Sequence, residues 1–155
     1  MPANLRKAEA DYADLTQRGA FGNAGRLELA LTVEDAVREA DVAVDFVPDE
    51  LESKLEIFSM IDRMAPPKTI LCTPSYALSI TDLASCVYRP ERCVAVRGNL
   101  LRGDAGVPPV VRLLYPAAAA ASTLTAMGEF LGALGIEVQQ ECDPEVPVLT
   151  KNTGV

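Results

Sequence analysis

Residues 41–73 read DVAVDFVPDELESKLEIFSMIDRMAPPKTILCT, and this stretch decides the fold class. Its first part, 41–48, is a nearly continuous apolar run closed by Pro48, which is typical of a strand covered on both faces. Apolar residues then recur at helical spacing until the sequence APP ends the pattern, and TILCT follows at 69–73. The stretch therefore predicts a strand, a helix and a second strand in a parallel arrangement.

The same alternation continues on both sides of this unit. Toward the C-terminus, the pattern predicts a helix at 79–87, strands at 92–98 and 110–115, a helix at 120–135 and a strand at 136–140. Toward the N-terminus, it predicts a helix at 3–18, a strand at 26–32 and a short helix at 33–40. We expect one α/β domain over residues 1–155, with a mainly parallel sheet and helices on both faces.

Charge and hydropathy narrow the classes of partner. The 155 residues carry 14 basic and 22 acidic side chains, a net charge of −8, which predicts no nucleic-acid and no membrane partner. The sequence has no run of 18 apolar residues, and we expect no leader peptide at its N-terminus. The expected location is therefore the cytoplasm.

The residue types exclude several kinds of catalytic site. The chain has no histidine and no CxxC pair, which together exclude zinc fingers, Cys/His pairs and Ser/His/Asp triads. The cysteines show no CxxC spacing, and we expect all four to be buried and reduced: Cys72, Cys86, Cys93 and Cys142. We expect no metal site.

The segment 37–96 carries several motifs together, including VAVDFVPDELESK, a helix ending in MAPP, ILCTPSYALSIT and RPERCVAV. In this combination it resembles the NAD-binding domain of the L-3-hydroxyacyl-CoA dehydrogenase family. That family reads ADLVIEAVPEDLELK, LAPP, ILASNTSSLSIT and RPERVIGMHFFNP in the same order. The similarity extends over about residues 5–143 and implies a Rossmann-like fold.

The resemblance also implies what this sequence lacks. Family members open with a strand, GxGxxG and a helix, whose N-terminus binds the cofactor pyrophosphate. Here Gly19, Gly22 and Gly25 follow a predicted helix instead of a strand, so we interpret them as turn glycines. We expect an incomplete domain without the first βαβ glycine-loop unit. No cofactor is expected, or NAD if the family activity is retained.

The family's catalytic positions are substituted. Its catalytic histidine falls on Arg97, whose guanidinium cannot accept a proton, and the partner glutamate falls near Leu114. The asparagine and the substrate-binding serine of its loop fall on Pro74 and Tyr76. We expect no catalytic residues. Tyr76 is either half of a new acid pair with Arg97 or a half-buried packing residue.

Two positions on the cofactor side of the family site survive, Asp49 and Lys54. They either retain a cofactor contact or simply suit the solvated N-terminus of a helix. Phe46 replaces a family alanine near the nicotinamide. Asp45 is a carboxylate in an apolar strand, and it either serves a site or ends the strand by accepting backbone hydrogen bonds. The RGD at 102–104 is interpreted as a loop.

Two functions remain open. The first is a catalytically silent relative that acts through self-association or with a dehydrogenase-like partner subunit. The alternative is an NAD-dependent 3-hydroxyacyl-CoA dehydrogenase represented by an incomplete or split chain. In the family's sheet, the missing strand lies between the equivalents of 42–47 and 26–32. We therefore expect either that 26–32 pairs with 42–47 or that another chain supplies a strand at this edge.

Overall fold

The strand, helix and strand predicted for residues 41–73 are present in the computed structural model, which describes residues 3–17, 25–99 and 107–144. They are β1 (Val42–Val44), α3 (Leu51–Met64) and β2 (Ile70–Pro74). The two strands are parallel, with Val42 opposite Ile70 and Val44 opposite Cys72. The fold prediction for the deciding stretch is confirmed.

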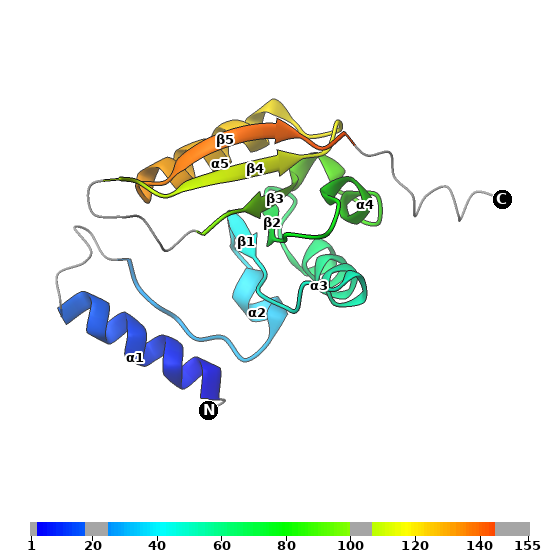
Figure 1. Cartoon of the computed structure of the whole chain (residues 1–155). Coiled ribbons are helices and arrows are strands. Elements are labelled where there is room, and N and C mark those ends of the chain that lie inside the picture. Colours follow the sequence, from blue (N-terminus) through cyan, green and yellow to red (C-terminus); the bar gives the residue numbers. More distant parts are fainter. Residues whose placement is uncertain (1–2, 18–24, 100–106, 145–155) are drawn as a thin grey trace.

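Three more strands of the described residues belong to the sheet: β3 (Cys93–Arg97), β4 (Val110–Tyr115) and β5 (Glu137–Cys142). The five strands lie in the order β1-β2-β3-β4-β5, and β3 and β4 form the antiparallel pair. All other neighbours are parallel. The sheet is therefore mainly parallel, as expected, with β1 at one edge and β5 at the other (Figure 1).

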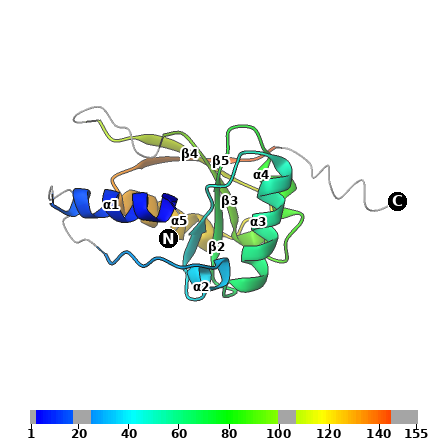
Figure 2. The same ribbon diagram turned by 90° about the horizontal axis from the view of Figure 1, so that it is seen from below.

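Helices cover both faces of this sheet (Figure 2). The helices α2 (Val33–Val37), α3 and α4 (Ile80–Ala84) lie on one face, and α5 (Ala121–Ala133) lies on the other. A short 3-10 turn, η1 (Pro90–Arg92), leads into β3. The first helix, α1 (Ala3–Gln17), lies apart from the sheet in Figure 1.

Each face has its own apolar core, which explains the continuous apolar runs of β2 and β3. Leu71 faces α3 and α4, whereas its neighbour Cys72 faces α5. Because both faces are covered, successive side chains along a strand are all buried. On the α3 side the buried residues include Phe58, Ile61, Leu83 and Ala95, and on the α5 side Val94, Leu113, Met127 and Leu131.

The prediction of a strand at 26–32 is wrong. Residues 25–30 have no helix or strand, and 31–32 form a bend. Alternating apolar residues suit a strand, but a strand also needs a neighbour for its backbone groups. Among the described strands, β1 pairs only with β2, so 26–32 does not pair with 42–47. Gly25 is not in a turn, while Gly19 and Gly22 lie outside the described residues.

We expect Gly98→Ala to lower the free energy of unfolding by about 1–3 kcal/mol. Gly98 follows β3 with a φ of +132°, and a Cβ there would lie 3.1 Å from the Val110 carbonyl oxygen and 3.2 Å from the Val111 Cα. Alanine must therefore change the backbone or push β4 away from β3. Chemical denaturation measures the loss.

Gly132→Ala is the matched control, because Gly132 lies within α5 and a Cβ there meets nothing within 4 Å. Alanine should stabilise this position by about 0.5–1 kcal/mol, since it loses less backbone entropy than glycine on folding. Equal effects of the two substitutions would contradict the close approach of β3 and β4 at Gly98.

Candidate functional site

The candidate site lies at the carboxyl ends of the parallel strands β1, β2 and β3. Open parallel sheets bind ligands outside these strand ends. The segment 75–78, here called the 75–78 loop, follows β2 at this point, and Ser75 is buried. The Ser75 amide donates to the Val96 carbonyl at 3.2 Å, so the loop begins as an extension of the sheet.

Asp49 holds the 75–78 loop from the connection between β1 and α3. Its two carboxylate oxygens accept hydrogen bonds from Ser75 Oγ at 2.6 Å and from the Tyr76 amide at 2.9 Å. Partial burial raises the pKa of Asp49, but the bonds from Ser75 and Tyr76 and the charge of Lys54 outweigh it and lower this pKa overall. Asp49 is therefore an ionised anchor for the loop.

Lys54 and Asp45 form a buried ion pair beneath the loop. Both side chains are 1% exposed, and Lys54 Nζ lies 2.7 Å from Asp45 Oδ1. Lys54 Nζ also donates to the Pro74 carbonyl at 3.0 Å. The interpretation of Lys54 as a solvated helix residue is therefore wrong. Asp45 accepts from the Lys54 ammonium, so its interpretation as a strand end capped by backbone donors is also wrong.

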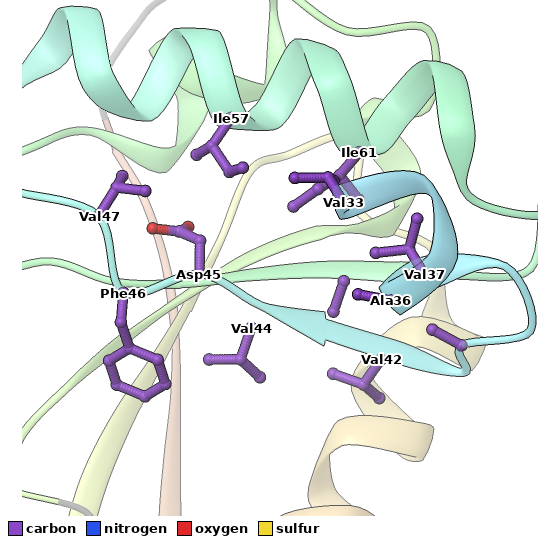
Figure 3. Close-up of a pocket in the computed structure, with 12 residues that line it drawn as sticks. Val33, Ala36, Val37, Val42, Val44, Asp45, Phe46, Val47, Ile57 and Ile61 are labelled. Carbon is purple, nitrogen blue, oxygen red and sulfur yellow. The ribbon is translucent and has the colours of Figure 1, made fainter. Parts of the chain in front are cut away.

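The second carboxylate oxygen of Asp45, Oδ2, does not take part in this ion pair. Asp45 Oδ2 is buried and has no hydrogen-bond partner among the described residues. Figure 3 shows the carboxylate pointing toward Val47 and Ile57, in a cavity between α2, β1 and α3. The ion pair thus satisfies only part of the hydrogen-bonding capacity of this carboxylate.

Arg97 holds the 75–78 loop from the opposite side to Asp49. Its Nε donates to the Ser75 carbonyl and a terminal nitrogen donates to the Leu78 carbonyl, both at 3.2 Å. The Tyr76 hydroxyl instead donates to the Gly98 carbonyl at 3.3 Å. These bonds do not form the acid pair considered for Tyr76 and Arg97. The half-buried packing role is also wrong, because Tyr76 is 73% exposed.

The position aligned with the family glutamate does not supply a carboxylate either. Leu114 is buried in β4 and lies opposite Ala95 of β3. Directly opposite Arg97 is Arg112, whose Nε donates to Glu141 on β5 at 2.9 Å. In the structure, both family positions therefore have side chains that pack or hold backbone.

The other candidate residues differ from expectation in part. Cys72 and Cys93 are buried, and burial raises the pKa of the Cys72 thiol to about 12. Cys86 and Cys142 are exposed, so the expectation of four buried cysteines is wrong for these two. Phe46 is 78% exposed beside the end of β1.

The described residues provide neither a metal-binding cluster nor a membrane-spanning helix. They contain no group of three or more His, Cys, Asp or Glu side chains that can hold a metal ion. No described helix is both long enough and apolar enough to cross a membrane. The RGD at 102–104 lies outside the described residues.

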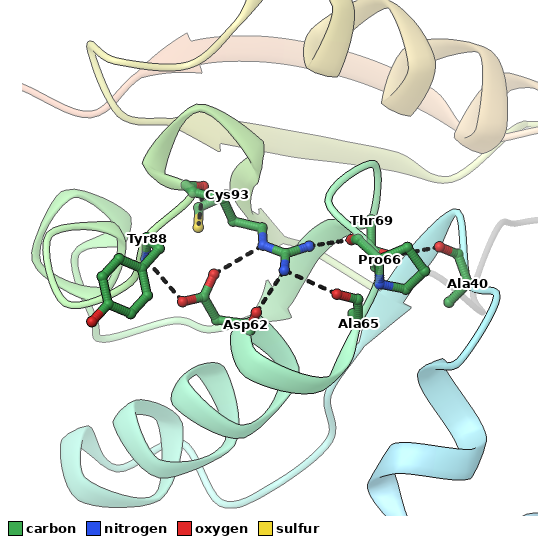
Figure 4. Close-up of polar contacts among 8 residues, drawn as sticks. Ala40, Asp62, Ala65, Pro66, Thr69, Tyr88 and Cys93 are labelled. Atoms are coloured by element: carbon green, nitrogen blue, oxygen red, sulfur yellow. Dashed lines mark hydrogen bonds and ion pairs between the residues drawn. The ribbon is translucent and has the colours of Figure 1, made fainter.

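A second charged cluster, not anticipated from the sequence, lies at the C-terminal end of α3 (Figure 4). Arg89 Nε donates to Asp62 Oδ1 at 2.9 Å, and another guanidinium nitrogen donates to the Ala65 carbonyl at 3.1 Å. Asp62 Oδ2 accepts from the Tyr88 amide at 2.9 Å. A cation is favoured at this end of a helix, where carbonyl groups lack helical partners. The cluster holds the segment that leads into β3. The sequence signal for it is Asp62, a carboxylate on the buried face of α3.

Comparisons with known proteins agree with this architecture. A family profile described as "3-hydroxyacyl-CoA dehydrogenase, NAD binding domain" matches residues 4–97. A probable 3-hydroxybutyryl-CoA dehydrogenase from Bacillus subtilis is 28% identical over 113 residues, 73% of this chain and 39% of that protein. An L-carnitine dehydrogenase from Pseudomonas syringae is 34% identical over 85 residues, 54% of this chain and 27% of that protein.

Solved structures show the same fold. The 3-hydroxybutyryl-CoA dehydrogenase of Escherichia coli K12 matches with a TM-score of 0.74 and 23% identity, over 91% of this chain and 31% of that one. An NAD⁺-dependent 5-formyl-3-hydroxy-2-methylpyridine 4-carboxylic acid 5-dehydrogenase matches with a TM-score of 0.74 and 20% identity, over 99% of this chain and 50% of that one. This chain thus spans half or less of the length of these relatives. It belongs to the family of 3-hydroxyacyl-CoA dehydrogenase NAD-binding domains.

Proposed function

We propose that this chain acts by binding another polypeptide segment along the edge of β1, and that its own residues do not oxidise hydroxyacyl substrates. The partner is a second copy of the chain or a dehydrogenase-like subunit. The observation that carries the proposal is the edge of β1, which among the described strands has β2 as its only neighbour.

The β1 edge is apolar as well as unpaired. Val44 is 37% exposed and Phe46 is 78% exposed. Natural proteins pair such an edge, cover it or place charge on it, because its free backbone groups otherwise recruit other strands. Within 42–47 the one charged side chain is Asp45, which turns inward to Lys54, so the exposed charge at this edge is Asp41 before the start of β1. This edge is suited to strand addition.

An apolar groove continues this surface on the α5 face of the sheet. It is lined by Val44 and Phe46 from the edge and by Phe130 and Leu134 from α5, among others. Phe130 is 39% exposed and Leu134 is 62% exposed. A partner that pairs with β1 and fills this groove removes a continuous apolar surface from water, which favours association.

The 75–78 loop supports the non-catalytic part of the proposal. Arg97 cannot accept a proton, and its guanidinium is bound to two loop carbonyls. The side chain that replaces the family serine, Tyr76, points its hydroxyl to the Gly98 carbonyl. The loop keeps an ordered frame without a general base for a hydroxyl substrate.

The alternative is an NAD-dependent 3-hydroxyacyl-CoA dehydrogenase that is represented here by an incomplete or split chain. The ordered position of Asp49 beside the strand ends favours it, whereas Lys54 is buried in its ion pair with Asp45. In that case the segment bound at β1 brings the glycine-rich loop, and the assembly holds NAD. Relatives of this chain include a protein described as a probable 3-hydroxybutyryl-CoA dehydrogenase.

We expect Val44→Lys to dissociate the assembly and to lower the stability of the fold, because lysine places a charge in the apolar edge. Light scattering and analytical ultracentrifugation of the 155-residue chain measure the first effect, and thermal denaturation the second. Val110→Lys is the matched control, since Val110 is also exposed, at 45%, but lies on β4 between two strands. A wild-type chain that is monomeric at every concentration tested would contradict self-association.

We also expect the 155-residue chain to bind NAD weakly or not at all. No GxGxxG occurs in its sequence, and Phe46 stands where the family has a small residue near the nicotinamide. Isothermal titration calorimetry measures the affinity, with Phe46→Ala tested in parallel. A dissociation constant in the micromolar range for the wild-type chain would support the alternative function instead.

The double variant Arg97→His, Tyr76→Ser should not gain 3-hydroxyacyl-CoA oxidation. A base and a serine act only when cofactor and substrate are held about 3 Å apart in the reactive geometry. The double variant also loses the Arg97 bonds to the loop carbonyls, so the single variant Tyr76→Ser serves as its control. Formation of NADH by the double variant, followed by absorbance, would disprove this expectation.

A further inference from the structure

A second cavity borders the β1 edge, on the face opposite the α5 groove. It has a volume of about 340 Å³ and lies between α2, β1 and α3 (Figure 3). Aliphatic side chains form most of its wall, including Val33, Val37, Ile57 and Ile61. Val44 and Phe46 border both this cavity and the α5 groove, so the edge strand separates two apolar sites.

Asp45 Oδ2, which has no hydrogen-bond partner among the described residues, determines which groups are favourable in this cavity. The Asp45 side chain is 1% exposed, its carboxylate points into the cavity, and Oδ2 has no partner among the described residues. A buried acceptor without a donor is unfavourable, and more so when it carries charge. The cavity therefore favours an occupant that brings a hydrogen-bond donor to Oδ2.

The ion pair decides what kind of donor this is. Lys54 already balances the charge of Asp45 through Oδ1. A second cation would add an unbalanced charge to an apolar site, and an anion would be repelled by the carboxylate. The favoured donor is therefore neutral, such as a hydroxyl group.

An extended peptide can pair with the backbone groups of β1 and also fill the apolar sites on both faces of the sheet. A strand added to β1 pairs with its free backbone groups and sends alternate side chains to the two faces of the sheet. Side chains on one face enter the cavity beside Asp45, and those on the other face meet the α5 groove. A small molecule in the cavity leaves the backbone edge unpaired.

We propose that the cavity between α2, β1 and α3 is a specificity pocket for one side chain of the strand that pairs with β1. That side chain has an apolar body and a neutral hydrogen-bond donor at its end, as tyrosine has, and the donor binds Asp45 Oδ2. The inference rests on the proposed function, because it names the chemistry of the strand that the β1 edge accepts. Residues Val42–Val44 contain no such side chain, so the bound strand is not a second copy of β1 itself.

The test uses two capped synthetic peptides that differ by one hydroxyl, Lys-Val-Ile-Tyr-Val-Ile-Lys and the same sequence with Phe in place of Tyr. The lysine ends suit a chain whose net charge is −8. Each peptide is titrated into the 155-residue chain by calorimetry. We expect the Tyr peptide to bind about tenfold tighter or more, the usual effect of a hydrogen bond to a charged group.

Asp45→Asn tests whether the preference comes from this carboxylate. The Asn carbonyl can keep the bond to Lys54, while its amide replaces the free acceptor, so the ratio of the two affinities should fall to about one. Asp49→Asn is the matched control, because Asp49 does not line the cavity, and it should keep the preference. Circular dichroism establishes that both variants fold.

If Asp45→Asn does not fold, the peptide pair still tests the proposal on the wild-type chain. A second variant, Ala36→Phe, fills the cavity from an exposed position of α2 and should weaken the Tyr peptide most. Equal affinities for the two peptides would contradict the specificity pocket, and this is the result expected if water alone binds Oδ2. If Val44→Lys then abolishes binding of both peptides, the proposed binding along the β1 edge still stands. Binding of neither peptide would overturn the pocket, and the oligomeric state of the chain then decides the edge function separately.

Discussion

The buried ion pair between Asp45 and Lys54 is the interaction on which the site end of the sheet depends. It joins the end of β1 to α3, and through the Pro74 carbonyl it joins both to the start of the 75–78 loop. Two charges removed from water must satisfy each other, so neither side chain can turn outward without leaving its partner unpaired in an apolar region. The pair therefore holds three segments in one arrangement.

The same constraint shapes the surface of the molecule. Because Asp45 is committed to Lys54, the exposed side chains where β1 ends are the apolar Val44 and Phe46. Lys54 reaches only one of the two Asp45 oxygens, and the other is left facing the cavity under α3. The apolar edge of β1 and the unpaired oxygen Asp45 Oδ2 thus have the same cause, because the Asp45 carboxylate points inward to Lys54.

Around this pair, charged side chains hold the 75–78 loop from two sides. Asp49 binds it through Ser75 and Tyr76, and Arg97 binds its carbonyls from β3. These contacts hold the loop through its backbone and through the Ser75 side chain. The loop is therefore ordered although the positions aligned with the family's catalytic pair hold Arg97 and Leu114.

The sequence by itself determined the elements whose pattern is local. Three local patterns predict β1, α3 and β2: the apolar run at 41–48, the helical spacing before APP and the apolar run at 69–73. Such patterns can be recognised in the sequence because the spacing of apolar residues in a strand or a helix depends only on neighbouring residues. It also determined the absence of a histidine base. The strand expected at 26–32 was not formed, since pairing depends on a neighbour that periodicity does not contain. The burial of Lys54 was decided only by tertiary structure: it shares a helix face with Phe58 and Ile61, but its stability there requires Asp45 from another element. A buried charge is a property of two segments that meet, and their meeting is set by the packing of α3 on the sheet.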